Sequence, residues 1–353
     1  MFVKGIPSDK SIDFCDPFDL RWILADPIDY VVPVTTLFGA YNNTTAKWLG
    51  GCLAKTGNIY VVPYDDTTIL KINPNTRALT RIGNFVNTGK YFGAISHPNG
   101  KIYAVPYGAS SILEIDPTND TTRPVGAYGT STLKWCGAVV APNNKIYFIP
   151  HSHNSILEFD PETEQSRYIG NFVGATKFGG ASLGPDGKIY LIPMNYNSIV
   201  EFNPTTDEIK THGNFTGSTK WRGSTLAPNG KIYAAPCTNS SILEFDPITK
   251  TITLLGNLGG LANKYSDCCL APNGKIYCSP TAATSILELD PETKQIANIG
   301  SFASSTGKWH GLVLAPNGKL FGLPYVIGTV LELDTFNVPQ KDYMCLHPYI
   351  NKY

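Results

Sequence analysis

A lysine followed directly by a large aromatic residue recurs seven times along this chain of 353 residues. The seven pairs are Lys47-Trp48, Lys90-Tyr91, Lys134-Trp135, Lys177-Phe178, Lys220-Trp221, Lys264-Tyr265 and Lys308-Trp309. Successive pairs are 43 or 44 residues apart, so almost the whole chain repeats one unit. A period of this length is typical of a four-stranded propeller blade. The repeat therefore predicts an all-β fold, a seven-bladed β-propeller with four antiparallel strands in each blade.

The copy in residues 220–258 shows how one repeat forms a blade. Its first strand, strand A, is rich in small residues, as expected for the strand nearest a crowded axis. Asn229 and Gly230 then supply a tight turn because both residue types tolerate positive φ. Strand B ends at Pro236, and every copy has an equivalent proline. Strand C ends before Pro247. The last segment alternates like an exposed outer strand, strand D.

The last copy, residues 308–334, lacks a convincing fourth strand. A segment that resembles strand D, residues 34–41, instead precedes the first repeat. We therefore expect the N-terminal strand to complete the last blade in a 3+1 arrangement, which removes exposed sheet edges. The propeller then spans residues 31–334. Residues 1–30 are expected to form an N-terminal extension and residues 335–353 a C-terminal tail near the closing blade. The two segments could pack together as a cap over that blade, or they could form a docking surface for a partner.

The composition excludes several function classes. The chain has 28 basic and 28 acidic residues, so no net charge draws it to nucleic acid or to an anionic membrane. The first residues contain no apolar run of a signal peptide, which predicts a cytoplasmic protein. The eight cysteines show no CxxC spacing, so buried free thiols are expected rather than disulfides or a zinc site.

One paired difference between copies identifies neighbours in space. Six copies carry a lysine that opens strand B and a glutamate in strand C, whereas the first copy has Asn58 and Lys71 instead. Because both residues change in the same copy, we expect the lysine and glutamate to pair within each blade. The six predicted pairs are Lys101 with Glu114, Lys145 with Glu158, Lys188 with Glu201, Lys231 with Glu244, Lys275 with Glu288 and Lys319 with Glu332.

The lysines that open strand A persist in all seven copies. In a propeller the D–A and B–C loops share one face, so these lysines should ring one mouth of the central channel. Converging ammonium groups would bind a small anion such as phosphate or sulfate, or an acidic peptide, on the axis. In the structural alternative, their heads bond loop carbonyls and fix the corner. The predicted ring comprises Lys47, Lys90, Lys134, Lys177, Lys220, Lys264 and Lys308.

The residues next to these pairs contain the strongest candidates for chemistry. Arg222, Asp267 and His310 lie on three successive copies, at equivalent or adjacent positions near the axis. A basic group, a carboxylate and an imidazole could form a catalytic acid/base cluster if the protein is an enzyme, or a polar binding site. They could equally form a local salt bridge. His151 and His153 give only a weak metal signal because no third ligand accompanies them, so no metal ligand is assigned.

Tyrosines in the loops after strand B suggest a recognition surface. Tyr64, Tyr107 and Tyr325 follow the strand-B proline directly, and Tyr196 lies in an equivalent loop. An aromatic, amphipathic rim of this kind is typical of interfaces.

The repeated motif, K-[WYF]-x-G-x-x-x-A-P-N-G-K-I-Y-x-x-P followed by S-I-L-E-[FLI]-D-P, resembles the blades of a broad seven-bladed group. This group includes kelch-like, NHL-like, gluconolactonase-like and streptogramin-lyase-like proteins. The kelch double glycine and the WD dipeptide are absent from the repeats. Streptogramin-type lyases use a histidine with acidic help and magnesium, a resemblance that would implicate His310 and Asp267. Gluconolactonase-like enzymes use a metal cluster of carboxylates and amides, for which only Asp267 offers an inner-strand carboxylate.

These observations favour a non-enzymatic binding or scaffold propeller that recognises a protein, peptide or glycan through its D–A/B–C face. No cofactor is expected for such a protein. The alternative is a lyase or hydrolase with its site at the channel mouth, where a divalent metal could assist.

Overall fold

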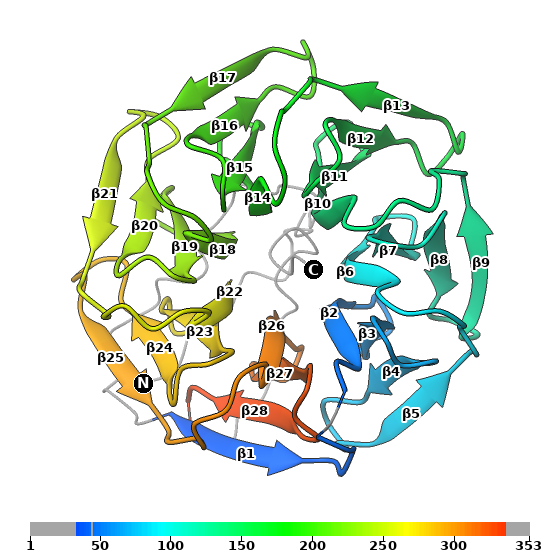
Figure 1. Cartoon of the computed structure of the whole chain (residues 1–353). Coiled ribbons are helices and arrows are strands. Elements are labelled where there is room, and N and C mark those ends of the chain that lie inside the picture. Colours follow the sequence, from blue (N-terminus) through cyan, green and yellow to red (C-terminus); the bar gives the residue numbers. More distant parts are fainter. Residues whose placement is uncertain (1–32, 44, 337–353) are drawn as a thin grey trace, which may run out of the picture.

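The computed structural model describes residues 33–43 and 45–336, and all of its regular elements in these ranges are strands. The strands form seven four-stranded antiparallel sheets arranged as blades around a central axis (Figure 1). The predicted all-β, seven-bladed propeller is therefore confirmed. The predicted N-terminal extension and almost all of the C-terminal tail lie outside the described residues. No described helix is long and apolar enough to cross a lipid bilayer.

Each blade begins with a strand at the axis, strand A, and continues outward. The seven A strands are β2 (Trp48–Leu53), β6 (Tyr91–Ser96), β10 (Trp135–Val140), β14 (Phe178–Leu183), β18 (Trp221–Leu226), β22 (Tyr265–Leu270) and β26 (Trp309–Leu314). The seven B strands, all ending at the repeated proline, are β3 (Ile59–Pro63), β7 (Ile102–Pro106), β11 (Ile146–Pro150), β15 (Ile189–Pro193), β19 (Ile232–Pro236), β23 (Ile276–Pro280) and β27 (Leu320–Pro324).

The outer half of each blade consists of strands C and D. The C strands are β4 (Ile69–Ile72), β8 (Ile112–Asp116), β12 (Ile156–Phe159), β16 (Ile199–Phe202), β20 (Ile242–Phe245), β24 (Ile286–Leu289) and β28 (Val330–Asp334). The D strands are β5 (Leu79–Ile82), β9 (Thr121–Val125), β13 (Ser166–Ile169), β17 (Ile209–His212), β21 (Ile252–Leu255), β25 (Ile296–Ile299) and, in the last blade, β1 (Val34–Phe38).

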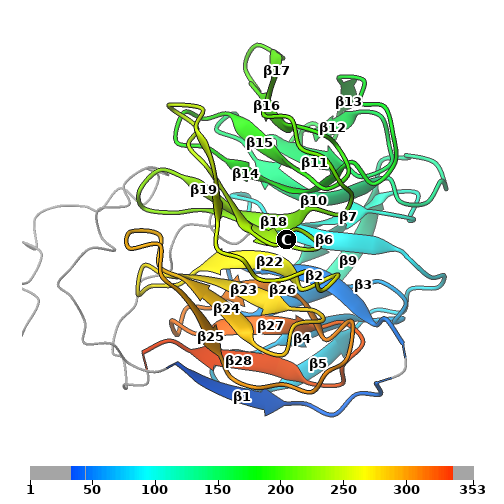
Figure 2. The ribbon, with the colours of Figure 1, turned by 60° about the vertical axis from the view of Figure 1, so that its left-hand side comes forward.

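The last blade combines the two ends of the described chain. β1 pairs antiparallel with β28, from Val34 opposite Asp334 to Phe38 opposite Val330. Figures 1 and 2 show these two strands side by side at the rim of the ring. This pairing covers the outer edge of β28 with a strand from the other end of the repeat array, so that blade also has four strands.

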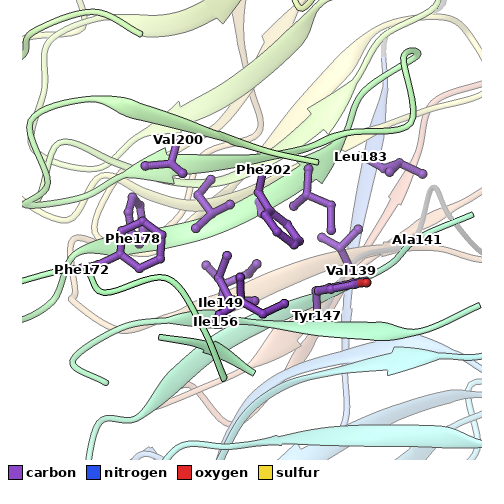
Figure 3. Close-up of a cluster of buried hydrophobic side chains, with 14 residues drawn as sticks. Val139, Ala141, Tyr147, Ile149, Ile156, Phe172, Phe178, Leu183, Val200 and Phe202 are labelled. Carbon is purple, nitrogen blue, oxygen red and sulfur yellow. The ribbon is translucent and has the colours of Figure 1, made fainter. Parts of the chain in front are cut away.

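The hydrophobic core lies between neighbouring blades. Figure 3 shows one cluster in which Ile149 and Tyr147 of blade 3 pack against Phe178, Val200 and Phe202 of blade 4. The repeated tryptophans are fully buried, and their indole N–H groups donate to a carbonyl at the end of the B–C loop, as from Trp221 to Ser241 at 2.8 Å. The aromatic member of each Lys-aromatic pair is therefore part of the scaffold. All described cysteines are buried and free.

The predicted lysine–glutamate pairs are present within the blades. Five lysine Nζ atoms lie 2.6–2.8 Å from the glutamate of the same blade. Lys101 lies 3.7 Å from Glu114 and closer, at 2.8 Å, to Asp116. The glutamates are buried, so these ion pairs are better shielded from solvent than ordinary surface pairs.

The first blade replaces this pair with a contact to its neighbour. Lys71 Nζ lies 2.8 Å from Asp120 Oδ2 in the C–D turn of blade 2, and Tyr60 also donates to that carboxylate. Blade 4 has the opposite polarity, because its Glu201 binds Lys250 in the C–D turn of blade 5 at 2.8 Å. The turn residues Asp120 and Lys250 share a positive φ of 60° and 62°. Relative to Glu201 and Lys250, both charges are therefore reversed in the first pair: strand C carries the lysine and the C–D turn of the next blade carries the carboxylate.

We expect either single replacement, Lys71→Glu or Asp120→Lys, to lower the free energy of unfolding by about 1 kcal/mol, because each puts like charges together. The double variant should recover most of that loss, since it recreates the polarity seen between Glu201 and Lys250. A double-mutant cycle of urea unfolding measures the coupling. Additive losses in the double variant would show that the two residues do not interact.

Candidate functional site

A bulge near the start of strand A sets the side chains that face the channel. The pairing of strands A and B shifts register there in every blade. In six blades the glycine two residues after the aromatic residue adopts a positive φ, which only glycine tolerates well. Blade 5 differs because Arg222 remains paired with Ala235 and only Gly223 is left out of the ladder. The backbone of Arg222 is therefore held in a register that the equivalent residues lack.

Backbone hydrogen bonds join all the blades in a closed ring at this end of the channel. In each blade, the residue after the strand-B proline donates its N–H to the carbonyl of the strand-A lysine, as from Tyr64 to Lys47 at 2.9 Å. Its own carbonyl accepts from the lysine N–H of the next blade, as from Lys90 to Tyr64 at 3.1 Å. The last blade continues the ring, because Lys47 N–H donates to Tyr325 O. We call this the backbone ring.

The lysine side chains are occupied within their own corners. Each ammonium group donates to at least one carbonyl of the D–A loop before it, for example Lys134 to Ser131 O at 2.7 Å. All seven lysines are buried, and burial lowers the pKa of each, that of Lys134 to about 8. These contacts are those of the structural alternative rather than of an axial anion site built by the lysine heads.

Two sets of side chains occupy the mouth inside the backbone ring. The residues after the strand-B prolines are Tyr64, Tyr107, His151, Met194, Cys237, Thr281 and Tyr325. The second residues of the A strands are Leu49, Phe92, Cys136, Gly179, Arg222, Ser266 and His310. Aromatic rings are concentrated on blades 7, 1, 2 and 3, whereas blades 4, 5 and 6 contribute smaller groups and Arg222. The mouth is therefore strongly asymmetric despite the repeated backbone.

The rings on blades 7, 1, 2 and 3 pack into one cluster. Phe92 of blade 2 lies edge-on to His310 of blade 7, with ring centroids 5.1 Å apart. Tyr64 of blade 1 lies between Tyr107 and Tyr325, at 6.1 and 6.0 Å. His151 joins the cluster through Tyr107 at 5.4 Å. We call Tyr64, Phe92, Tyr107, His151, His310 and Tyr325 the mouth cluster.

Arg222 faces this cluster from blade 5. Its positive charge acts on the pKa of Tyr107, His151, His310 and Tyr325, which belong to blades on both sides of the axis. The side chain is half-buried, and within the described residues it makes no hydrogen bond or ion pair. The sequence-predicted Arg222, Tyr64, Tyr107, Tyr325 and His310 are thus gathered at one mouth.

Both histidines of the cluster are held uncharged at neutral pH. Burial and, to a smaller extent, the charge of Arg222 lower the pKa of His310 to about 3. Burial, Arg222 and Lys177 together lower the pKa of His151 to about 4. A base this weak carries out little proton abstraction near pH 7. The imidazoles are better suited to packing and to neutral hydrogen bonding.

Asp267 makes contacts of a structural kind. Its carboxylate accepts hydrogen bonds from the backbone N–H groups of Cys268, at 2.8 Å, and of Leu312 in blade 7, at 3.4 Å. A Cβ added at Gly223 would lie 2.1 Å from Asp267 Oδ1, so the carboxylate also packs against the backbone of blade 5. Asp267 therefore connects blades 5, 6 and 7 where blade 6 lacks the bulge glycine.

Two loop residues differ from the sequence-based interpretation. His153 stacks near Trp135 at 4.6 Å and Tyr168 at 5.0 Å, whereas His151 lies in the mouth cluster, so the two imidazoles do not share a site. Tyr196 packs against Phe172 and Phe178 and leaves the equivalent mouth position to Met194. The residue directly after the strand-B proline lies at the mouth, whereas a residue farther along the same loop, such as Tyr196, does not. In residues 33–336 apart from 44, no cluster of three or more His, Cys, Asp or Glu could hold a metal ion.

The fold and the mouth define a seven-bladed β-propeller with an asymmetric, aromatic channel mouth. No protein-family model matches the sequence, and no curated protein does. Solved structures share the fold. A streptogramin B lyase has a TM-score of 0.74 and 13% identity over 87% of this chain and 99% of its own.

Two further structures show how widely the fold is used. A catalytically inactive variant of virginiamycin B lyase from Staphylococcus aureus, with quinupristin, has a TM-score of 0.73 and 13% identity over 85% of this chain and 99% of its own. Hydrazine synthase from Kuenenia stuttgartiensis has a TM-score of 0.61 and 12% identity over 83% of this chain and 96% of its own. Identities this low show the common fold and leave activity to the residues of the site.

Proposed function

We propose that this protein is a non-enzymatic binding propeller that recognises a peptide segment of a partner protein at the D–A/B–C face. The observation that carries the proposal is the asymmetric mouth, where Tyr64, Tyr325 and Arg222 remain partly exposed above a buried aromatic base. Tyrosine and arginine are the residue types enriched in the energetically important parts of protein interfaces. A rigid backbone ring holds them, which reduces the entropy lost on binding.

Apolar side chains around the mouth support a peptide rather than a glycan. Four D–A loops expose an aliphatic residue on this face: Leu133 at 37%, Leu261 at 52%, Val86 at 71% and Val173 at 78%. Such residues bury favourably against the side chains of a peptide, whereas a sugar offers them little apolar surface. The face therefore combines a polar, aromatic centre with apolar contacts farther out.

The site residues favour binding over the lyase or hydrolase alternative. An acid/base mechanism needs a group whose pKa lies near the working pH, and the pKa of His310 is far below it. The carboxylate of Asp267 accepts hydrogen bonds from the backbone amides of Cys268 and Leu312. Turnover of quinupristin by the intact protein, abolished by His310→Ala, would contradict the binding proposal.

A peptide selection tests the proposal. The intact protein, immobilised, is incubated with a soluble random-peptide library with free C termini, and retained peptides are identified by mass spectrometry. We expect enriched peptides whose affinity falls at least tenfold, about 1.4 kcal/mol, in a Tyr64→Ala/Tyr325→Ala variant that still melts cooperatively. Tyr168→Ala, on outer strand β13, is the matched control and should bind normally. No enrichment, or equal binding by the mouth variant, would refute the proposal.

A further inference from the structure

We propose that the channel mouth binds a carboxylate group, with Arg222 as its counter-charge and the mouth cluster as the support for an apolar or aromatic body attached to it. This inference rests on the proposed function and narrows its ligand. A peptide that carries a carboxylate beside an apolar or aromatic side chain has the required chemistry.

Arg222 differs from every other described arginine. Arg77, Arg81, Arg123 and Arg167 each lie within 3.1 Å of a carboxylate oxygen. The side chain of Arg222, a half-buried residue, makes no ion pair or hydrogen bond with the described residues. A partly desolvated guanidinium without an acceptor is costly, and an incoming carboxylate would satisfy up to two of its N–H groups.

The other polar groups at the mouth can also donate. The hydroxyls of Tyr64, Tyr107 and Tyr325 have no described hydrogen-bond partner, and none is among the buried unsatisfied atoms, so each reaches solvent. Burial raises the pKa of all three, that of Tyr325 to about 12, so the hydroxyls stay protonated at neutral pH. The charge of Arg222 reaches Tyr107 and Tyr325, and Tyr64 packs between these two rings. The three hydroxyl donors and the guanidinium therefore share one mouth, which accommodates oxygen acceptors.

The field at the mouth has the sign that an anion requires. The seven lysines around the backbone ring bond neutral carbonyls, so these contacts do not neutralise their charges. Asp65 is a carboxylate whose charge reaches Tyr64 and Tyr325, and its Oδ1 accepts from Gly89 N–H. The charge of Asp66 also reaches Lys47 and Lys90, and the carboxylate of Asp267 packs against Gly223, next to Arg222. Three carboxylates against seven lysines and Arg222 leave the cations of the mouth in excess, which attracts an anion from solution.

The arrangement fits a carboxylate better than a phosphate. A guanidinium matches the planar carboxylate with two parallel hydrogen bonds, and a single arginine balances its single charge. Phosphate carries nearly two charges at neutral pH, and all seven lysine heads are already held by loop carbonyls. The ring of Tyr325, whose pKa responds to the charge of Arg222, and the ring of Tyr64, 6.0 Å from it, offer apolar faces to the rest of the ligand.

Two small probes test the inference on the intact protein. The acid 3-phenylpropionate and its uncharged amide are titrated separately and followed by ligand-observed NMR. We expect millimolar binding of the acid, at least tenfold weaker binding of the amide, and loss of this preference in Arg222→Gln. Arg222→Lys, which keeps the charge without the planar fork, should retain part of it. Lys210→Gln removes an exposed charge from outer strand β17 and should leave the preference unchanged. Inorganic phosphate should compete weakly.

The inference and the proposed function fail separately. Equal binding of acid and amide, or an unchanged preference in an Arg222→Gln variant with native melting, overturns the carboxylate inference. Selected peptides that tolerate both C-terminal amidation and Asn or Gln in place of their acidic residues overturn it too, while peptide recognition still stands. If one of these changes weakens binding tenfold, it identifies whether the bound group is the chain terminus or an acidic side chain.

Discussion

Replacing Gly223 with alanine is expected to lower the free energy of unfolding by about 3 kcal/mol, from backbone strain and steric overlap together. Gly223 has a φ of 48°, and an added Cβ would lie 2.1 Å from Asp267 Oδ1 and 2.6 Å from Asp267 Cα. Blades 5 and 6 would have to separate at the channel. The variant should therefore also displace Arg222, its neighbour in the chain, and weaken binding at the mouth.

Gly230 is a matched control for this substitution. It has a φ of 77°, but no atom lies within 4 Å of an added Cβ, so Gly230→Ala isolates the backbone term of about 1 kcal/mol. Adding Asp267→Gly to Gly223→Ala should restore part of the loss, because it removes the carboxylate from the contact. Urea unfolding followed by tryptophan fluorescence measures all three variants. Equal losses for Gly223→Ala and Gly230→Ala would mean that the two blades are not in tight contact there.

Removing the buried carboxylate of Glu201 is expected to cost about 3 kcal/mol of unfolding free energy, because three partners lose their acceptor together. Glu201 accepts from Lys188 at 2.6 Å, from His212 at 2.7 Å and from Lys250 of the next blade at 2.8 Å. Glu201→Ala should therefore loosen blade 4 and its contact with blade 5. Glu208→Ala removes an exposed carboxylate from the same blade and should change stability little.

The same residue predicts an acid transition. Burial alone would raise the pKa of Glu201, but its hydrogen bonds with Lys188, Lys250 and His212 outweigh burial and lower the pKa to about 2, from an ordinary 4.5. A lowered pKa adds stability that is complete above pH 4.5 and is lost as the pH falls from about 4.5 to about 2. Wild-type melting temperature should decline through this window, and more steeply than that of Glu201→Ala. Parallel declines would show that Glu201 does not contribute.

The fold could be predicted closely from the sequence because the repeat supplies seven copies of the same evidence. The prolines that end strand B and the glycines of the bulge occur at fixed spacing, and each has a local backbone reason. The paired loss of a lysine and a glutamate in the first blade correctly indicated a contact. It did not reveal Asp120, because that partner lies one repeat later and only the packing of blades brings it to Lys71.

The site was only partly predictable, for a related reason. Arg222 and His310 stand out in the sequence as departures from the repeat, and Tyr64, Tyr107 and Tyr325 as an aromatic rim in equivalent loops. The structure gathers these five residues at one mouth. The sequence did not show that Phe92 meets His310, because this contact joins blades 2 and 7, which are far apart in the chain. It also did not show that His151 packs on Tyr107 of the adjacent blade, because the repeat pattern does not say which loop side chains turn inward. Nor did the sequence separate the role of Asp267 from those of Arg222 and His310, because it does not show that the Asp267 carboxylate binds backbone amides of blades 6 and 7. The burial that lowers the pKa of His310 also cannot be predicted from the repeat pattern of the sequence.

The backbone ring has a consequence for how this protein can diversify. It joins the blades through N–H and C=O groups alone, so it places no chemical requirement on the seven side chains that follow the strand-B prolines. Tyrosine, histidine, methionine, cysteine and threonine already occupy those positions in one chain. With the proposed binding at the mouth, we expect substitutions there to alter ligand preference while the shared frame is retained. Repeat duplication followed by drift at seven sites would then be a short mutational path to new specificities. In a library of variants substituted only at these seven positions, we expect most members to fold.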